Sequence, residues 1–368
     1  MTIPGLGEIL TLIKKLVIKL DFSRHNSPNN KNVKKQTGDS SRQADLMINN
    51  DGIPVDVFER SMDTMAKLTQ DALGIVREQD DKLKVLMDKE VSGWDESSIQ
   101  KFRDPAIQLT MIDAGRANAE IKNEEMRRVL AKLIVKRVNP QSEDADNPLS
   151  DIIYSEAIRT TSKLTENQLK ILALIFVLKH TKSGLIYHYT SLVQYLDHFV
   201  KPLIDFNIGK NDLGHLQYTN TATRSIGSWN AFSIIGSLYP NAFPVIISNK
   251  EVTDHKFTKK QINALFEQQV GKYEFNRLDA EVIQKITKQF NLTDAQVEFI
   301  ESRSNSKIGD NEVKERLSSL GGVPERLKDI IENSEINHYS LTSIGVAIAI
   351  TYWEAKVGHN VDHSIWLG

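Results

Sequence analysis

The chain has 368 residues, 40% hydrophobic and 26% charged, which is enough for one large domain or two to three ordinary ones. Its 46 basic and 48 acidic residues nearly cancel, and a net charge of −2 argues against nucleic-acid binding through bulk charge. The absence of cysteine excludes disulfides, thiolate catalysis and thiolate metal sites, and it favours a cytoplasmic location.

Residues 1–20 form an amphipathic pattern at helical spacing, with lysines opposite a broad apolar arc. We expect this helix to dock on its own protein or on a neighbouring subunit. The alternative is a peripheral position in a membrane interface, with the lysines facing anionic headgroups. The position of the lysines within and after the apolar residues argues against a signal peptide. The expected contact residues are Ile9, Leu10, Ile13, Lys14, Lys15, Leu16, Val17, Lys19 and Leu20.

The next segment, residues 21–50, is rich in Asn, Ser, Lys and Asp, and this composition predicts a flexible linker. Residues 54–91 then predict a long helix with a break near Gly74. Its dense mixed charge is typical of a solvent-facing helix or a coiled-coil-like arm. We interpret Met62, Met65 and Met87 as core-filling residues rather than as an adaptable binding surface.

Residues 122–138 carry six basic and two acidic residues, a balance of +4, around an apolar stripe at helical spacing. A solvated charged face is the ordinary interpretation of this pattern. The alternative is a nucleic-acid face made by Arg127, Arg128, Lys132 and Lys136. Pro140 should end the helix just before it, because proline disfavours helical geometry in the preceding residue.

A second helix begins after Thr165, which can form a capping box with Gln168. Residues 171–178 are apolar on all sides, which predicts a buried helix at the centre of the fold, closed by Gly184. Two later helices should begin with the same Thr-x-x-Gln device, at residues 258–261 and 293–296. Residues 218–247 predict irregular structure with one short helix. The chain should end in a short extended stretch and a last apolar helix closed by Gly358.

These elements predict a mostly α fold, a multi-helix bundle with a short winged-helix-like β element near the C-terminus. We divide the chain into an amphipathic helix (1–20), a linker (21–50), a helical domain (51–204) and a helical C-terminal region with an irregular insertion (205–368).

Catalytic and ligand-binding motifs are missing from the sequence. It has no G-x-S-x-G turn, no phosphate-binding loop and no G-x-G-x-x-G after a strand. His359 and His363 could share a helix face and a metal, with Asp362 nearby, but no Glu stands in an H-E-x-x-H frame and the segment follows a helix-ending glycine, so we favour a polar tail. We therefore expect no catalytic, cofactor or metal residues, and an enzyme has no positive support.

Three segments resemble the bacterial abortive-infection alpha proteins: NEEMRRVLAKLIVKRV at 123–138, LTENQLKILALI at 164–175 and HYSLTSIGVAIA at 338–349. The resemblance implies a bacterial cytosolic helical protein linked to phage defence, and it supplies no catalytic residues. The chain departs from the family's pattern in its N-terminal arm and over residues 200–300. The matching positions are Glu125, Arg128, Leu130, Leu133, Leu164, Gln168, Ile171, Leu172, Leu341, Thr342 and Gly345.

The functional hypothesis is a non-enzymatic interaction protein, a phage-defence effector that acts through oligomerisation or membrane contact. Its expected partner is another protein or a second copy of itself, with an anionic membrane surface as the alternative. The competing hypothesis is a DNA-binding regulator, because the segment YSLTSIG after two helices also resembles a winged helix. The central helix offers only Lys170 and Lys179 as basic residues for reading DNA bases. If the chain does contain a winged helix, we therefore expect a degenerate one that makes protein contacts instead of binding DNA.

Overall fold

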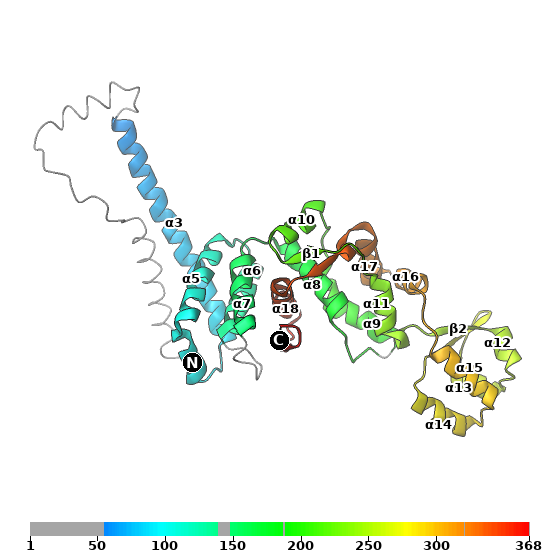
Figure 1. Ribbon diagram of the computed structural model, residues 1–368. Helices are drawn as coiled ribbons and strands as arrows, with labels where there is room; N and C mark the ends of the chain where they lie inside the picture. The colour runs from blue at the N-terminus through cyan, green and yellow to red at the C-terminus, as the bar shows by residue number, and fades with distance from the viewer. Residues whose placement is uncertain (1–54, 139–147, 187, 320, 368) are drawn as a thin grey trace, which may run out of the picture. The chain divides into compact units, whose positions relative to one another are not determined.

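The computed structural model describes residues 55–138, 148–186, 188–319 and 321–367 (Figure 1). The described part is mostly helical with two small antiparallel sheets, which confirms the predicted fold class. The chain divides into two compact units, Met1–Ser162 and Lys163–Gly368, which we treat separately. The sequence analysis placed a domain boundary at 204–205, and the difference arises because the central helix packs on C-terminal elements. The predictions for residues 1–50 lie outside the described residues.

The first unit is helical throughout its described part. Its elements are α3 (Val55–Glu90), α4 (Glu96–Gln100), η1 (Lys101–Arg103), α5 (Pro105–Glu120), α6 (Glu124–Val138) and α7 (Pro148–Thr161). Pro105 suits the first turn of α5 because it lacks an N–H, and Asp104 caps that turn by accepting from the Ala106 N–H at 2.7 Å. The predicted stripe of α6 is buried, with Leu130, Leu133 and Ile134 fully covered.

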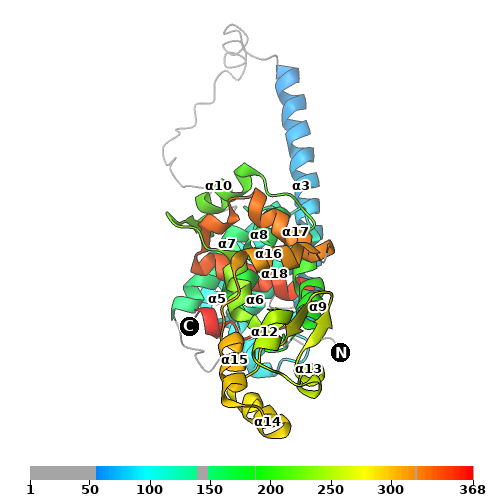
Figure 2. The same cartoon turned by 90° about the vertical axis from the view of Figure 1, so that its right-hand side faces the viewer.

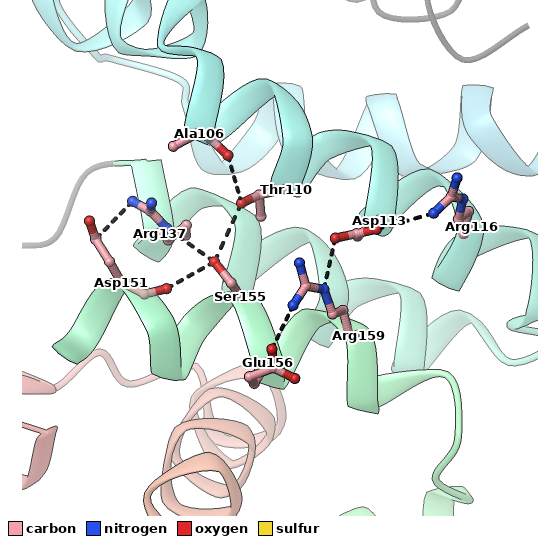
Figure 3. A network of polar contacts seen from close by, with 9 residues as sticks. All are labelled: Ala106, Thr110, Asp113, Arg116, Arg137, Asp151, Ser155, Glu156 and Arg159. Carbon is pink, nitrogen blue, oxygen red and sulfur yellow. Dashed lines mark hydrogen bonds and ion pairs between the residues drawn. The ribbon is translucent and has the colours of Figure 1, made fainter. Parts of the chain in front are cut away.

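A polar network joins α5, α6 and α7 at one side of the first unit (Figure 3). Arg159 bridges Asp113 of α5 at 2.8 Å and Glu156 of its own helix at 2.5 Å. The hydrogen bond to Asp113 raises the pKa of Arg159. Arg137 of α6 pairs with Asp151 of α7 at 2.7 Å. These pairs are partly exposed, so each stabilises the unit by less than about 1 kcal/mol and mainly orients the helices.

Helix α3 runs unbroken through 36 residues, so the predicted break at Gly74 is wrong. Gly74 stays helical because the backbone hydrogen bonds on both sides hold it, at a cost of about 1 kcal/mol relative to alanine. The C-terminal half of α3 packs on α5 and α6 and buries Leu83 and Met87, and Val91 is buried in the turn that follows. Its N-terminal half extends away from the other helices of the unit in both views (Figures 1 and 2).

The second unit is built on α8 (Glu166–His180), which lies against α18 (Ser343–Val357). Residues 168–178 of α8 are all buried, which confirms the predicted central helix. The Thr165–Gln168 capping box is present, whereas the predicted end at Gly184 is wrong. The helix ends at His180, and its C-cap Thr181 has an extended backbone and a hydroxyl that donates to the Val177 carbonyl at 2.7 Å. Gly358 closes α18 in a left-handed conformation (φ 69°), as predicted.

Two short strands bring distant parts of the second unit together. Strand β1 (Ala222–Arg224) pairs antiparallel with β5 (Tyr339–Leu341), immediately before α18. The wing-like element is thus a pair of strands far apart in the sequence, and β1 lies in the segment predicted to be irregular. That segment also holds the expected short helix, α11 (Ala231–Leu238), and a further strand, β2 (Val245–Ser248).

The Leu-Thr-x-x-Gly motif locks α18 onto the turn before β1. The Thr342 hydroxyl accepts from the Gly345 N–H at 3.1 Å and donates to the Asn220 carbonyl at 2.7 Å. A Cβ atom on Gly345 would lie 1.8 Å from the Thr221 carbonyl oxygen. Only glycine permits this close approach, so the motif is explained by packing.

A second hydrophobic cluster in this unit includes Phe257, Phe266, Phe275 and Phe299. It is built from the three-stranded sheet β2–β4–β3 and four helices. The predicted capping boxes at Thr258 and Thr293 are both present. The elements are α12 (Asn249–Asp254), α13 (Lys259–Leu265), β3 (Glu267–Gln269), β4 (Lys272–Phe275), α14 (Ala280–Phe290) and α15 (Asp294–Ser304).

In all three boxes the glutamine also reaches a second element. Its side-chain oxygen accepts from the threonine N–H, and its Nε2 donates to a distant carbonyl. Gln168 reaches Asp212 at 3.4 Å, Gln261 reaches Phe290 at 3.1 Å and Gln296 reaches His255 at 3.1 Å. The remaining elements of the unit are α9 (Tyr189–Tyr195), η2 (Leu196–Val200), η3 (Lys201–Leu203), α10 (Lys210–Tyr218), η4 (Pro240–Ala242), α16 (Asp310–Ser319), α17 (Gly322–Asn333), η5 (Ile336–His338) and α19 (Ser364–Leu367).

Candidate interaction surface

The N-terminal half of α3 carries large apolar side chains in the open. Every residue from 60 to 75 is exposed, including Met62 (51%), Met65 (63%) and Leu68 (61%). Leu73 and Ile75 are exposed to 44% and 58%. Single exposed apolar residues are normal on a protein surface, but a contiguous set on one element marks an interaction site.

These side chains continue the face by which α3 docks on its own unit. Met62, Met65, Thr69, Ala72 and Val76 follow one another at alternating spacings of three and four residues, and Leu83 extends the same series. Such spacing defines positions a and d of a heptad. Ala66, Leu68, Leu73 and Ile75 flank the series on both sides. We call the nine residues Met62, Met65, Ala66, Leu68, Thr69, Ala72, Leu73, Ile75 and Val76 the α3 apolar face.

No charged residue lies within the α3 apolar face. The charges between residues 60 and 78 fall on the other side of the helix, where three basic and three acidic residues alternate: Arg60, Asp63, Lys67, Asp71, Arg77 and Glu78. A helix with one apolar side and one charged side is stable in water only when something covers the apolar side. The pattern therefore indicates a missing contact.

A buried polar network marks the point where the unit begins to cover α3. Arg127 of α6 is 3% exposed and donates to Asn118 Oδ1 and to the Ile121 carbonyl, both at 2.9 Å, and also to Gln79 of α3. Asn118 in turn donates to Asp80 of α3 at 3.1 Å. Burial lowers the pKa of Arg127, while Glu124 and Glu78 act in the opposite direction. The network fixes α3 on α5 and α6, and beyond it toward the N-terminus the apolar face is open.

The four residues predicted as a nucleic-acid face do not share a solvent-exposed side. Arg127 and Lys136 are buried, at 3% and 8% exposure. Lys132 pairs with Glu90 at 3.0 Å, and Arg128 approaches Glu125 at 3.4 Å. The reason is that α6 lies between α3, α5 and α7, so its basic side chains serve as internal ties.

The two lysines of the central helix are also engaged within the protein. Lys170 is buried and pairs with Asp205 at 2.6 Å, and Lys179 donates to the Ser340 hydroxyl at 2.6 Å. Burial opposes the charge on Lys170, but the hydrogen bond and attraction of Asp205 and Glu166 leave its pKa raised. Both lysines of α8 therefore make contacts within the protein instead of facing a groove of DNA.

A shallow pocket of about 480 Å³ lies between the start of α11 and the end of α17. Phe232 and Ile331 form its apolar floor, and the Trp229 indole is held by a hydrogen bond from its Nε1 to the Tyr339 carbonyl at 2.9 Å. The carboxylates at its rim already have cationic partners: Glu332 pairs with Lys314 and Lys328, and Glu335 with Arg224. The rim thus offers no unbalanced charge to select a ligand.

The predicted histidine pair does not occupy one helix face, because residues 358–362 lie outside any helix. His363 is buried against Glu354 of α18, with 3.2 Å between Nε2 and Oε1, and the Val361 N–H donates to the same oxygen at 2.8 Å. His359 is exposed beside the rings of Phe199 and Trp353. Within the described residues no group of three or more His, Asp or Glu is arranged to hold a metal ion.

The predicted contact residues between Ile9 and Leu20 lie outside the described residues. Among the described helices, none has the length and apolar content needed to cross a bilayer. Sequence reasoning assigned Met62 and Met65 to a core and so missed the α3 apolar face. The sequence did contain a signal for this face, because the six charged residues between positions 60 and 78 fall at only three of the seven heptad positions. The sequence alone could not show where α5 and α6 stop covering α3.

Comparison with known proteins gives one family assignment and no closer relative. A protein-family model matches residues 52–367, and its description names no activity, substrate or ligand. The family is uncharacterised. No curated protein and no solved structure matches the chain.

Proposed function

The chain belongs to the family whose model spans residues 52–367, and from this premise we propose a non-enzymatic helical interaction protein that acts in bacterial phage defence through contacts of α3. The observation that carries the proposal is the α3 apolar face. An exposed helix face of this length, with every charge on the opposite side, suits recognition of another helix. Its methionines can adapt to a partner surface.

The defence role rests on the resemblance to abortive-infection alpha proteins. The residues that carry this resemblance are packing residues: Leu130 and Leu133 are fully buried in α6, and Gly345 allows the close approach to Thr221. Shared packing supports a shared architecture without implying shared chemistry. The proposed mode of action therefore rests on the interaction surface of α3 and not on the architecture.

The proposal is tested by a charge placed on either side of α3. Met65→Glu introduces a carboxylate into the apolar face, while Gln70→Glu introduces the same group on the opposite side. Because both side chains are exposed, neither change should lower the free energy of unfolding by more than about 0.5 kcal/mol. In a phage-challenged bacterial host, we expect Met65→Glu to abolish protection and Gln70→Glu to retain it. Equal protection by both variants would contradict the proposal.

Two other modes of action are distinguished with the same variants. If the protein acts at a membrane through residues 1–20, the full chain should float with anionic liposomes, and Met65→Glu should not prevent this. If it is a DNA-binding regulator, it should bind duplex DNA with an affinity that falls steeply with salt. The burial of Arg127 and Lys136 makes DNA binding the weaker alternative.

A further inference from the structure

We propose that residues 245–304 form a domain that folds and opens independently of the rest of the second unit, with Arg277 holding the segment by which the chain leaves it. We call residues 245–304 the inserted domain, because they lie in the chain between η4 and α16. They comprise the three-stranded sheet β2–β4–β3 and helices α12 to α15. The inference goes beyond the proposed function, since it involves no residue of α3.

The inserted domain has a hydrophobic core of its own. The ten buried residues of this core and the seven half-buried residues packed against them all lie between Val245 and Ile300. At its centre the Phe257 ring lies 5.1 Å from Phe266 and 5.9 Å from Phe299. A core that is drawn from one continuous segment is typical of a domain, because the apolar area that drives folding is buried within that segment.

The polar contacts of the inserted domain also close within it. Gln261 of α13 donates to the Phe290 carbonyl at the end of α14, and Gln296 of α15 donates to the His255 carbonyl just after α12. The helix pairs α12–α13 and α14–α15 therefore exchange hydrogen bonds reciprocally. In the part of the chain that the structure describes, the side-chain hydrogen bonds and ion pairs of this domain all end within residues 245–306.

Arg277 holds the chain where it leaves the inserted domain. Val245, the first residue of the domain, pairs with Phe275 of β4, so both ends of the domain lie near the end of this strand. Arg277 follows two residues later and is only 8% exposed. Its Nη1 donates to the Ser304 carbonyl at 3.1 Å and to the Ser306 carbonyl. A buried guanidinium is costly to leave without acceptors, so these bonds fix the outgoing segment firmly.

The incoming segment is held from the opposite direction. Arg316 of α16, outside the inserted domain, donates to the Pro244 carbonyl at 2.7 Å. The outgoing segment is therefore held by the domain itself, and the incoming one by the rest of the second unit. Loss of the Arg277 bonds should free residues 304–308 while the core of the domain stays closed.

Size determines which part of the second unit should open first. With about 60 residues, the inserted domain is close to the lower limit at which a domain folds alone. The rest of the unit contains the buried helices α8 and α18. Cooperative parts of one protein open with different free energies. We therefore expect the inserted domain to open more readily, while α8 and α18 stay closed.

Hydrogen exchange of the full chain, followed by mass spectrometry, tests the independence of the inserted domain. Phe257→Ala should speed amide exchange within residues 245–304 by about a hundredfold or more and leave α8 and α18 unchanged. Phe176→Ala in α8 is the matched variant and should have the reverse effect. The tryptophans of the second unit all lie outside the inserted domain, so Phe257→Ala should not shift the unfolding transition that their fluorescence reports.

Equal acceleration in the inserted domain and in α8 and α18, by either variant, would show a single cooperative unit and overturn the inference. Phe257→Leu is a milder change, and it must meet the same test if Phe257→Ala does not accumulate as a folded protein.

The role of Arg277 is tested by limited proteolysis of the full chain. Lys307 is exposed and lies in the outgoing segment. Arg277→Met keeps an unbranched side chain and removes the donors. It should raise the rate of tryptic cleavage after Lys307 by about tenfold, the effect of losing one hydrogen bond from a charged donor. Lys285→Met, which removes an exposed cation paired with Glu281 of its own helix, is the control and should leave this rate unchanged.

Two results would contradict the role of Arg277. An unchanged rate of cleavage after Lys307 would mean that its hydrogen bonds do not hold the outgoing segment. Faster exchange in α13 and β4, rising in parallel with cleavage, would mean that Arg277 supports the core of the inserted domain instead.

Discussion

Helix α8 and the N-terminal half of α3 are both rich in apolar residues, yet they have opposite surroundings. Residues 168–178 of α8 are all buried, whereas residues 60–75 of α3 are all exposed. The sequences differ in where the charges stand. Helix α8 has no charged side, and its buried Lys170 is neutralised by Asp205, while α3 keeps six charges on one side. The all-round apolar α8 is covered within its own unit, whereas the one-sided N-terminal half of α3 has an apolar side that the other described helices of its unit do not cover.

The largest expected effect is at the start of α18, which covers α8. In Gly345→Ala the new methyl group would overlap the Thr221 carbonyl, so α18 must shift. We expect a loss of about 4 kcal/mol or more in the free energy of unfolding. Urea denaturation followed by tryptophan fluorescence measures it, since Trp229, Trp353 and Trp366 lie in the second unit. Gly214→Ala, where no atom lies within 4 Å of the new Cβ, is the matched control and should be neutral or stabilising.

A large-to-small change in α8 sharpens the comparison. Phe176 is fully buried, with its ring 5.1 Å from Trp366 and 6.5 Å from Trp353. Phe176→Ala should cost about 3–5 kcal/mol because it leaves a cavity that rigid neighbours cannot fill. Thermal unfolding of the full chain would show this as a lowered transition of the second unit. A loss below about 1 kcal/mol would mean that α8 is not a tightly packed centre.

Alkaline pH should weaken the second unit. Burial raises the pKa of Tyr195 to about 12, although its hydroxyl lies 3.4 Å from Thr181 Oγ1. The unfolded tyrosine ionises near pH 10, so the unfolded state releases a proton that the folded state retains. Stability is therefore intact below about pH 10 and is lost as the pH rises toward about 12, by about 2–3 kcal/mol. Tyr195→Phe should flatten this slope of unfolding free energy against pH, and an unchanged slope would contradict the assignment.

A smaller difference in the free energy of unfolding should separate alanine substitutions of two threonines, one in α8 and one in α3. Thr165 caps α8 by accepting from the Gln168 N–H, so Thr165→Ala should cost about 1 kcal/mol. Thr64 lies on the exposed part of α3, and its hydroxyl only donates to the Arg60 carbonyl of the same helix at 2.7 Å. Thr64→Ala should change the free energy of unfolding by less than about 0.5 kcal/mol. Urea midpoints of the two variants test the ranking, which fails if Thr64→Ala is the more damaging.

The smallest effect on the fold is expected where the effect on the proposed contact of α3 is large. Leu68 is 61% exposed, so Leu68→Ala should leave the free energy of unfolding of the dilute chain within about 0.5 kcal/mol of its original value. The contact proposed for the α3 apolar face should nevertheless weaken, and the loss of protection in the phage-challenged host measures this. A clear loss of stability without any change in protection would contradict the comparison, because Leu68 would then be covered by its own chain.

Local signals in the sequence predicted much of the helical framework. Thr165, Thr258 and Thr293 were recognised as helix starts because a capping box depends on residues only three apart. Gly358 was recognised as a helix end for the same local reason. By contrast, Gly184 was mistaken for the end of α8, because the helix already ends at His180, where Thr181 turns to an extended backbone. The break at Gly74 was also wrong, since one glycine costs too little to interrupt a helix of 36 residues.

The strands and the interaction surface depended on distant residues. Strands β1 and β5 have three residues each, too few for an alternating pattern, and Ala222 pairs with Leu341 across more than a hundred residues of sequence. Whether Arg127 faces solvent or Asn118 likewise depends on how α5 and α6 pack. The candidate surface was visible as a pattern on α3, but the position where α5 and α6 stop covering it, at Gln79, required the structure.

The three Thr-x-x-Gln boxes also have a consequence for the order of folding. The threonine part of each box forms with the first turn of its helix, whereas the glutamine Nε2 finds its acceptor only when a segment 29 to 44 residues away arrives. Each helix start therefore contains one early and one late hydrogen bond. Replacing Gln296 by Glu would keep the early bond and remove the late donor. Such a variant should fold at nearly the original rate and unfold faster, so the same four-residue motif records two successive stages of folding.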